Sequence, residues 1–276
     1  MPSTTDPQPL PSPFFPAMSY LERFSLSDKV ILLTGGAGLY GRGLAADLAA
    51  AGATLVLAAR DVAKLETVAA EERARGFLVE AESLDQGEEA SVLALRDRVL
   101  ARHGRVDGLV NNAVARVVKG SGGTVAQWEE SMRVNATGLM LMHRAFGEGM
   151  AAQGNGSIVN IGSIQGMIGP SYELYEGTAM GDLPPDYFFH KGGMINLTRF
   201  YAALYGPRGV RVNCLSPGGF FNQQPEPFLS RYCEHTLLGR MADPSDLGGA
   251  VVFLLSAASR YVTGVNLPVD GGYTAK

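Results

Sequence analysis

A tyrosine and a lysine, Tyr187 and Lys191, lie four positions apart in the sequence. On a helix, side chains at positions i and i+4 lie on one face, so this phenol and this ammonium group can enter the same pocket. At a separation of ~5 Å and an effective dielectric constant of ~20, their attraction favours the ionised phenol by about 3 kcal/mol. Such a pair could exchange protons near neutral pH, as a general acid or base does. The alternative from the pair alone is an amphipathic helix with a buried tyrosine and a solvated lysine.

A glycine-rich turn lies far upstream of this pair, between a short apolar run and an alanine- and leucine-rich run. Glycines at such a turn let the backbone approach a pyrophosphate at the N-terminus of the following helix. The position of the turn favours a dinucleotide site over an ordinary loop. The predicted cofactor contacts in the turn are Gly35, Gly38, Leu39, Tyr40 and Gly41.

The end of the second apolar run bears on which dinucleotide is bound. A carboxylate at this place would bind the adenine ribose hydroxyls and repel a 2′-phosphate. The chain has Ala59 there, followed by Arg60, whose guanidinium can bind a phosphate with two hydrogen bonds. The sequence thus favours NADP(H) over NAD(H). Because Asp61 is adjacent, an ordinary surface arginine at a helix start is the alternative.

The hydrophobic pattern predicts the elements that position these residues. Short apolar runs typical of buried strands alternate with helical runs over most of the chain, which indicates an α/β fold with a doubly wound parallel sheet (a Rossmann fold). We expect one domain over residues 29–276, after a proline-rich flexible arm at 1–28. The expected strands are 29–34, 54–59, 77–81, 106–111, 157–161, 210–215 and 265–269, and the expected helices are 42–51, 61–75, 88–103, 125–152, 186–205 and 244–257.

Composition excludes several classes of protein. The 276-residue chain has a net charge of −4, which argues against a nucleic-acid or anionic-membrane surface. Two cysteines and four scattered histidines form no metal-ligand pattern, so we expect no metal. The first residues do not have the pattern of a signal peptide, and no apolar run is long enough to span a membrane. A cytoplasmic protein with a small-molecule substrate is expected.

Further motifs occur in a fixed order along the chain, and together they resemble the short-chain dehydrogenase/reductase family. After the glycine turn come Asn111-Asn112-Ala113, Asn135, Ser163, the Tyr187/Lys191 pair, Pro217-Gly218 and Asp270-Gly271-Gly272. The match covers nearly the whole chain after the arm. It implies hydride transfer between a nicotinamide and an alcohol or carbonyl carbon.

The resemblance also implies roles for individual residues. Tyr187 would be the general acid or base, and Lys191 would favour its ionised form and hold the nicotinamide ribose. Ser163 would bind the substrate oxygen, and Asn135 would hold a water that links Lys191 to solvent. The implied cofactor contacts further include Asn111, Ala113, Lys191, Pro217 and Gly218; the expected substrate contacts are Ser163, Gln165, Tyr187 and Phe220.

Three features depart from the compact branch of this family. Leu39 stands where a glycine is usual, and this spacing resembles the extended branch with its sugar-nucleotide epimerases and dehydratases. Val114 follows Asn-Asn-Ala where a glycine is usual. Ser163 precedes Tyr187 by 24 residues, about twice the usual interval, and the extra residues form an insert at 165–186. The C-terminal motifs nevertheless match the compact branch.

The insert bears on the substrate. Hydroxyl and carboxylate side chains outnumber large aliphatic ones in it, which suits a polyol or sugar-derived substrate better than a sterol or acyl chain. A solvated loop or a subunit contact is the alternative. Two other functions stay open: an epimerase or dehydratase with retained NAD, and a non-catalytic dinucleotide-binding protein. A homodimer or homotetramer is expected, because the C-terminal segment resembles one that packs between subunits in the family.

Overall fold

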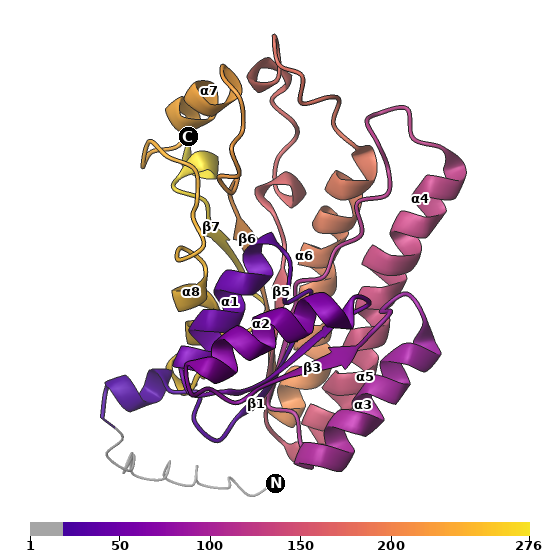
Figure 1. Ribbon diagram of the computed structural model, residues 1–276, viewed down its shortest axis with the longest axis vertical. Helices are drawn as coiled ribbons and strands as arrows, with labels where there is room; N and C mark the ends of the chain where they lie inside the picture. Colours follow the sequence, from indigo (N-terminus) through magenta and orange to yellow (C-terminus); the bar gives the residue numbers. More distant parts are fainter. Residues whose placement is uncertain (1–18) are drawn as a thin grey trace, which may run out of the picture.

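Seven strands form a single parallel sheet in the order β3-β2-β1-β4-β5-β6-β7 (Figure 1). The structure is a computed structural model that describes residues 19–276. Each expected strand is present, with ends within two residues of the expected ones. The strands are β1 (Val30–Thr34), β2 (Thr54–Ala59), β3 (Val79–Ser83), β4 (Gly108–Asn111), β5 (Gly156–Ile161), β6 (Val210–Pro217) and β7 (Asn266–Val269). The predicted doubly wound sheet is confirmed.

Helices cover both faces of this sheet (Figure 1). One face packs against α1 (Leu39–Ala50), α2 (Val62–Ala74) and α8 (Gly248–Leu255). The other packs against α3 (Glu89–His103), α5 (Gly138–Gln153) and α6 (Pro185–Tyr205). Alternate residues of β1 explain why the strand is apolar throughout: Ile31 and Leu33 join the first core, and Leu32 joins the second.

The long helix expected over 125–152 is interrupted by a π-helical turn. It consists of α4 (Val125–Met132), the π turn Arg133–Thr137 and α5. Thr124 caps α4 through a capping box with Gln127, which fixes where this helix begins. π turns inside α-helices are frequent at functional sites, and this one contains Asn135.

Part of the expected flexible arm is packed against the domain. Residues 1–18 lie outside the described residues, but 19–28 contain a short 3₁₀ helix, Leu21–Phe24. The Leu26 side chain is fully buried in the core, and its amide donates a hydrogen bond of 2.8 Å to the Ala51 carbonyl. The expectation of a flexible segment is therefore wrong for residues 19–28, because Leu26 supplies the apolar anchor.

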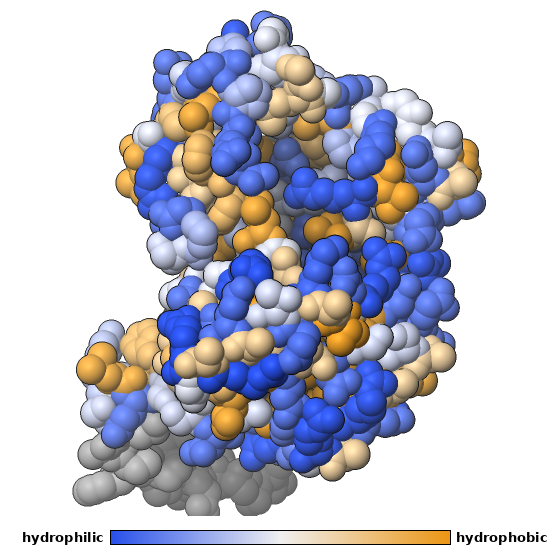
Figure 2. All heavy atoms as spheres, viewed as in Figure 1, coloured by the Kyte–Doolittle hydropathy of each residue, from blue (hydrophilic) through white to orange (hydrophobic). Residues whose placement is uncertain are grey.

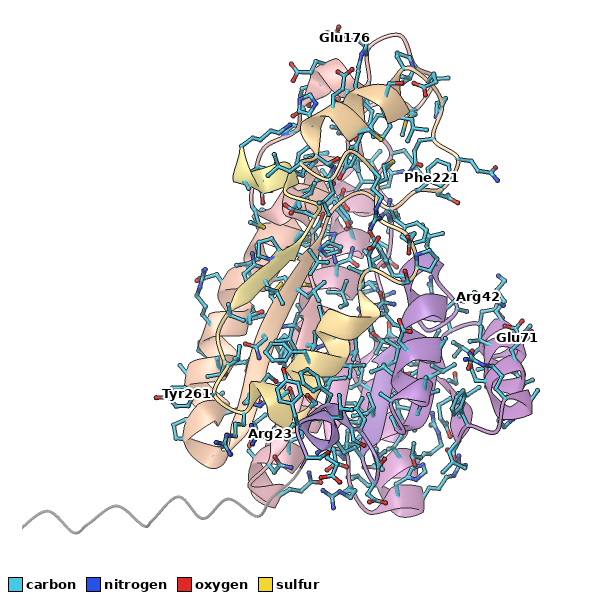
Figure 3. All side chains as sticks on the ribbon, turned by 90° about the vertical axis from the view of Figure 1, so that its left-hand side faces the viewer. Arg23, Arg42, Glu71, Glu176, Phe221 and Tyr261 are labelled. Atoms are coloured by element: carbon cyan, nitrogen blue, oxygen red, sulfur yellow. The ribbon has the colours of Figure 1, made fainter. Side chains whose placement is uncertain are left out.

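One helix that the sequence reading missed, α7 (Phe228–His235), stands beyond the carboxyl ends of the strands (Figure 1). It packs on the insert through a small apolar cluster of its own, which contains Leu174, Phe228, Tyr232 and Met241. Figure 3 shows Glu176 of the insert and Phe221 at the same end of the molecule, with Tyr261 near the opposite end. The last helix is shorter than expected, since α8 begins at Gly248 rather than near residue 244.

Candidate active site

A cleft of about 790 Å³ lies at the carboxyl ends of the strands, where a doubly wound sheet binds its ligands. Figure 2 shows the molecular surface hollowed on this side, with both hydrophilic and hydrophobic residues around the opening. Among the predicted site residues, those that line the cleft are Gly35, Gly38, Leu39, Tyr40, Arg60, Ala113, Tyr187, Lys191 and Phe220.

The glycine turn has the geometry that a bound pyrophosphate requires. Gly35 has a φ of +69°, a conformation that L side chains rarely adopt, and Gly38 stands at the N-cap of α1. Gly41 lies beneath the turn, where a Cβ would stand 2.1 Å from the Gly35 carbonyl oxygen. The backbone is thus open to a phosphate at the start of α1, so these residues fit a dinucleotide. Leu39, at the usual glycine place, has a half-exposed side chain at the mouth of the cleft.

Thr34 joins this turn to the loop after β4. Its hydroxyl accepts hydrogen bonds of 3.0 Å from the amides of Asn112 and Ala113. The Asn112 side chain in turn donates to the carbonyls of Thr34 and Gly35 at 3.0 and 3.1 Å. The two loops that border the cofactor half of the cleft are therefore fixed to each other through main-chain groups.

Tyr40 has a role that the sequence did not indicate. Its hydroxyl donates a hydrogen bond of 2.8 Å to the Gly218 carbonyl, and its ring meets Phe220 edge-on at 4.9 Å between centroids. Burial raises the pKa of Tyr40, so the group stays protonated as a donor. Tyr40 thus connects the start of α1 to the bend after β6. Gly218 itself borders a separate small hollow beside Asp270, while Pro217 ends β6.

At the tip of β2, the charged side chains differ in how they are paired. Asp61 accepts a hydrogen bond from the Lys64 amide and forms an ion pair of 2.7 Å with its ammonium group. These hydrogen bonds hold the pKa of the Asp61 carboxyl below its usual value. Arg60 has no described ion pair or side-chain hydrogen bond within residues 19–276, and it lines the cleft.

The predicted proton-transfer pair lies on one face of α6, as expected. The Lys191 Nζ lies 5.6 Å from the centroid of the Tyr187 ring and donates a hydrogen bond of 2.5 Å to the Ile161 carbonyl. Lys191 is buried, and burial lowers the pKa of its ammonium group, while the neighbouring Tyr187 raises it. A buried cation fixed beside a phenol is the arrangement that stabilises a phenolate during proton transfer.

Ser163 and Gln165 follow β5, and neither is among the residues that line the cleft. The buried Ser163 hydroxyl accepts a hydrogen bond of 3.1 Å from the Gln165 amide, which leaves its own proton free to donate. The Gln165 side chain borders a second hollow of about 510 Å³, next to Met167, Tyr172 and other residues of the insert. The structure therefore places Gln165 beside the cleft rather than in its lining.

Asn135 and Asn111 lie behind the cleft. In the π turn, the Asn135 side chain pairs with both main-chain groups of Ala115 at 2.8 Å and also donates to Ser131 at 3.0 Å. The buried Asn111 side chain donates to Asn160 at 2.9 Å, and its oxygen has no described partner. Both border a very small cavity of about 10 Å³ beside Lys191, which is close to the least that one water needs.

Two residues near Tyr187 were missed by the sequence reading. The guanidinium carbon of Arg116 lies 5.1 Å from the centroid of the Tyr187 ring, and the His190 ring meets Tyr187 edge-on at 5.2 Å. Burial, followed by the charges of Lys191 and Arg116, lowers the pKa of His190 to about 3, so its imidazole is neutral. His190 could have been noticed from its place between the pair, whereas Arg116 belongs to no motif.

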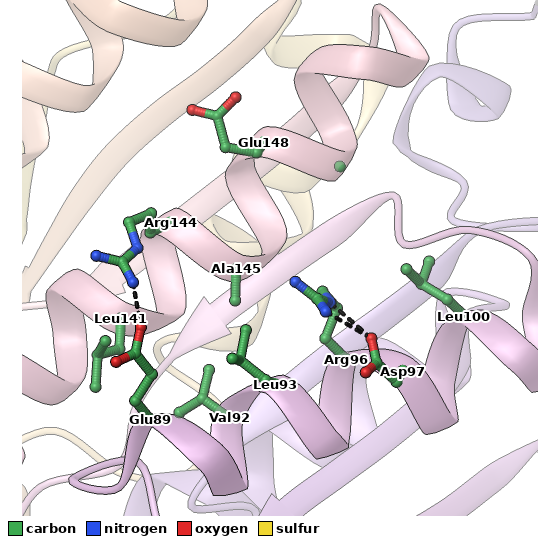
Figure 4. A pocket seen from close by; sticks show the side chains of 11 residues that line it. Glu89, Val92, Leu93, Arg96, Asp97, Leu100, Leu141, Arg144, Ala145 and Glu148 are labelled. Atoms are coloured by element: carbon green, nitrogen blue, oxygen red, sulfur yellow. Dashed lines mark hydrogen bonds and ion pairs between the residues drawn. The ribbon is translucent and has the colours of Figure 1, made fainter.

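A further hollow of about 640 Å³ lies between α3 and α5, away from the predicted site residues. Its charged side chains are largely paired, as Arg144 with Glu89 and Arg96 with Asp97 show in Figure 4. We regard it as a groove between packed helices.

Within residues 19–276, no cluster of three or more acidic, histidine or cysteine side chains could hold a metal ion. No helix in that range combines the length and apolarity needed to span a membrane.

Comparison with known proteins gives consistent matches over this fold. A family model described as enoyl-(acyl carrier protein) reductase matches residues 38–274. Galactitol 2-dehydrogenase (L-tagatose-forming) of Cereibacter sphaeroides is 34% identical over 265 residues, which cover 93% of this chain and 99% of the relative. Gluconate 5-dehydrogenase of Gluconobacter oxydans is 31% identical, with the same coverage of both chains.

Solved structures agree with these relatives. The crystal structure of a gluconate 5-dehydrogenase from Burkholderia cenocepacia J2315, in complex with NADP and tartrate, superposes with a TM-score of 0.84. It is 34% identical, and the match covers 93% of this chain and 99% of that one.

Proposed function

Because this chain belongs to the short-chain dehydrogenase/reductase family, we propose that it oxidises a polar, sugar-derived secondary alcohol with NADP⁺ and that Tyr187 accepts the hydroxyl proton. The chain is an NAD(P)(H)-dependent oxidoreductase of secondary alcohols and ketones, like its dehydrogenase relatives. Relatives that act on galactitol and gluconate support a polyhydroxylated substrate. The insert beside the cleft adds hydroxyl and carboxylate side chains that suit such a substrate.

The proposed reaction assigns one task to each residue near the reacting carbon. A bound nicotinamide would supply the acceptor for a hydride, that is, for the hydrogen together with both electrons of the substrate C–H bond. The ionised Tyr187 takes the hydroxyl proton, so that a ketone, a reduced cofactor and one released proton result. The Lys191 charge stabilises that phenolate, and the free proton of Ser163 holds the substrate oxygen. The observation that supports this reaction most directly is that Tyr187 and Lys191 line the same cleft as the glycine turn.

The proposed preference for NADP(H) depends on Arg60. Its guanidinium forms no described ion pair or hydrogen bond within residues 19–276, although its charge helps to lower the pKa of Glu130, which is paired with Arg133, and the neighbouring Asp61 is engaged by Lys64. A 2′-phosphate would give Arg60 a charge-assisted bidentate contact. The change Arg60→Ala should raise the KM for NADP⁺ roughly 10- to 100-fold, the worth of about 1.4–2.7 kcal/mol, and leave the KM for NAD⁺ nearly unchanged. Equal effects on both cofactors would contradict this assignment.

We further propose that the protein forms a homodimer or homotetramer and is located in the cytoplasm. Large apolar side chains stand exposed on the outer side of α6: Phe189, Phe200 and Leu204 are 62%, 59% and 44% exposed. Such a patch is typical of a surface that another subunit covers. The free thiols of Cys214 and Cys233 suit a reducing compartment. Light scattering of the purified protein tests the assembly, and a monomer at micromolar concentration would contradict it.

A substrate panel tests the activity. Purified protein is mixed with polyols, sugar acids and their keto forms, together with either cofactor, and the nicotinamide absorbance is followed. We expect net NADP⁺ reduction with at least one polyhydroxylated alcohol. Tightly retained NAD without net turnover would instead support an epimerase or dehydratase, and cofactor binding without turnover across the panel would support a non-catalytic protein.

A further inference from the structure

The reaction end of the cleft contains a second cation besides Lys191. The guanidinium carbon of Arg116 lies 5.1 Å from the centroid of the Tyr187 ring, and Lys191 Nζ lies 5.6 Å from the same centroid. Lys191 is buried and hydrogen-bonded to the Ile161 carbonyl, whereas Arg116 is exposed in the cleft lining. The two charges therefore differ in availability, because only Arg116 can reach a bound molecule with its full set of donors.

Arg116 has no described counter-charge within residues 19–276. Its side chain makes no described ion pair or hydrogen bond there; it lies over the aromatic ring of Tyr187, and its charge also acts on His190 and Lys191. Among the described residues, the acidic ones that line the cleft are Asp61 and Asp85, which follow β2 and β3 at its cofactor end. Burial lowers the pKa of Lys191, and the Arg116 charge lowers it further. An anion beside Arg116 would remove this repulsion.

The backbone that carries Arg116 is held in place. Both main-chain groups of the preceding residue, Ala115, pair with the Asn135 side chain at 2.8 Å. Asn135 is fixed in turn by the buried Ser131, whose hydroxyl donates to Asp186 next to Tyr187. One chain of hydrogen bonds thus links the positions of Arg116 and Tyr187. A preorganised cation at a fixed place relative to the proton acceptor is suited to orient a substrate.

We propose that Arg116 binds a carboxylate of the substrate, so that the substrate is a short polyhydroxy acid rather than a neutral polyol. The inference rests on the proposed function, since the secondary hydroxyl of that acid is the group oxidised to the ketone. The carboxylate is unchanged in the reaction and serves to orient the carbon chain. A planar guanidinium suits this contact because it binds a carboxylate with two parallel hydrogen bonds.

The test compares substrates that share a carbon skeleton and differ in one carboxylate: threitol with threonate, and glucitol with gluconate. Steady-state kinetics are measured with NADP⁺ for the wild type, Arg116→Gln and Arg116→Lys. The matched control is Lys119→Gln, an exposed cation three residues further on that does not line the cleft and whose described contact with Arg116 is a hydrogen bond of 3.4 Å to the main-chain carbonyl. We expect the wild type to favour the acid of a pair in kcat/KM by at least roughly tenfold, the worth of one charge-assisted contact.

In Arg116→Gln, kcat/KM for the acid should fall roughly 10- to 100-fold through KM, and at least ten times more than for the matched polyol. Arg116→Lys should retain part of the preference, and Lys119→Gln all of it. Equal losses for acid and polyol would overturn the proposal in favour of a structural role of the stacked guanidinium. An increased KM for NADP⁺ with an unchanged acid preference would assign Arg116 to a cofactor phosphate instead.

Binding separates this inference from the proposed activity. If the wild type turns over no member of the panel, the proposed function fails, and calorimetric titration of the NADPH complex with threonate and gluconate still decides the role of Arg116. Acid binding that Arg116→Gln abolishes and Lys119→Gln retains supports the carboxylate site. Absence of acid binding by the wild type, or binding that Arg116→Gln leaves unchanged, overturns it.

Discussion

The two halves of the cleft are built in different ways. The cofactor half is built around main-chain groups: Gly35 and Gly41 shape the turn, and the side chains of Thr34 and Asn112 join the loops through hydrogen bonds to main-chain atoms. The other half is lined by side chains of α6 and of the loops after β4 and β6; beside it lies the insert (residues 165–186), which is attached to α7 by a small apolar cluster. The comparison teaches that the cofactor site tolerates little change, whereas the substrate site can vary without disturbing the sheet.

The largest effect on stability should come from a single methyl group in the cofactor half. In Gly41→Ala the new Cβ would stand 2.1 Å from the Gly35 carbonyl oxygen, so the turn must shift. We expect the free energy of unfolding to fall by about 2–3 kcal/mol and the affinity for NADPH to fall roughly 100-fold. Urea titration and cofactor fluorescence measure the two losses.

The matched control is Gly149→Ala in α5, where no atom lies within 4 Å of the new Cβ. This change should stabilise the protein by up to about 1 kcal/mol, because alanine favours a helix. Similar behaviour of the two variants would contradict the close packing of the glycine turn.

The next largest effect is expected from low pH, which should destabilise the folded protein through two buried histidines. Burial lowers the pKa of His190 and of His143 to about 3, so both stay neutral in the folded protein at pH 5. Below pH ~6.5 the unfolded chain takes up these protons and the folded one does not, so the free energy of unfolding falls as pH falls. The loss approaches about 1.4 kcal/mol per pH unit for each histidine.

Urea titrations at pH values between 7 and 5 measure this slope. In His190→Asn the contribution of His190 to this slope should disappear, while the contribution of His143 remains. Near His190 the ionisable groups are Tyr187, Lys191 and Arg116, and the polar amides are Asn111 and Asn135. An unchanged slope in the variant would show that His190 is not buried as a neutral ring.

The smallest effect should come from the attachment of the insert. Arg231 of α7 donates hydrogen bonds to the carbonyls of Glu173 and Glu176 at 2.8 and 2.7 Å. Arg231→Ala should loosen the insert and raise KM for the substrate about fivefold, the worth of roughly 1 kcal/mol, with little change in cofactor affinity. Arg208→Ala, which removes an exposed ion pair with Glu148, is the control and should change neither constant.

Local sequence patterns were sufficient for the sheet and for most of the cleft. The inner strands β1 and β2 have nearly unbroken apolar runs because both of their faces are buried, and the glycine turn lies at the place required by its backbone geometry. The four-residue spacing likewise placed Tyr187 and Lys191 on one face of α6. These features follow from residues close together in the sequence.

Contacts between distant residues could not be predicted in the same way. Tyr40 bonds to Gly218, 178 residues away, and Arg116 reaches the Tyr187 ring from another loop. The helix α7 was missed because a proline-rich stretch precedes it and its apolar residues pack on the insert, Met241 and Tyr273, in a cluster separate from the two cores of the sheet. The π turn at Asn135 depends on hydrogen bonds to Ala115, which no periodicity shows.

The central claim is that proton transfer by Tyr187 takes place beside an independently built cofactor site, and Tyr187→Phe tests it most directly. The change removes one hydroxyl and keeps the ring that Lys191 and Arg116 contact. We expect kcat to fall by about 10²- to 10⁴-fold, while the dissociation constant for NADPH, measured by fluorescence, stays within roughly threefold of the wild type. Turnover near the wild-type rate, or a parallel loss of NADPH binding, would contradict the account.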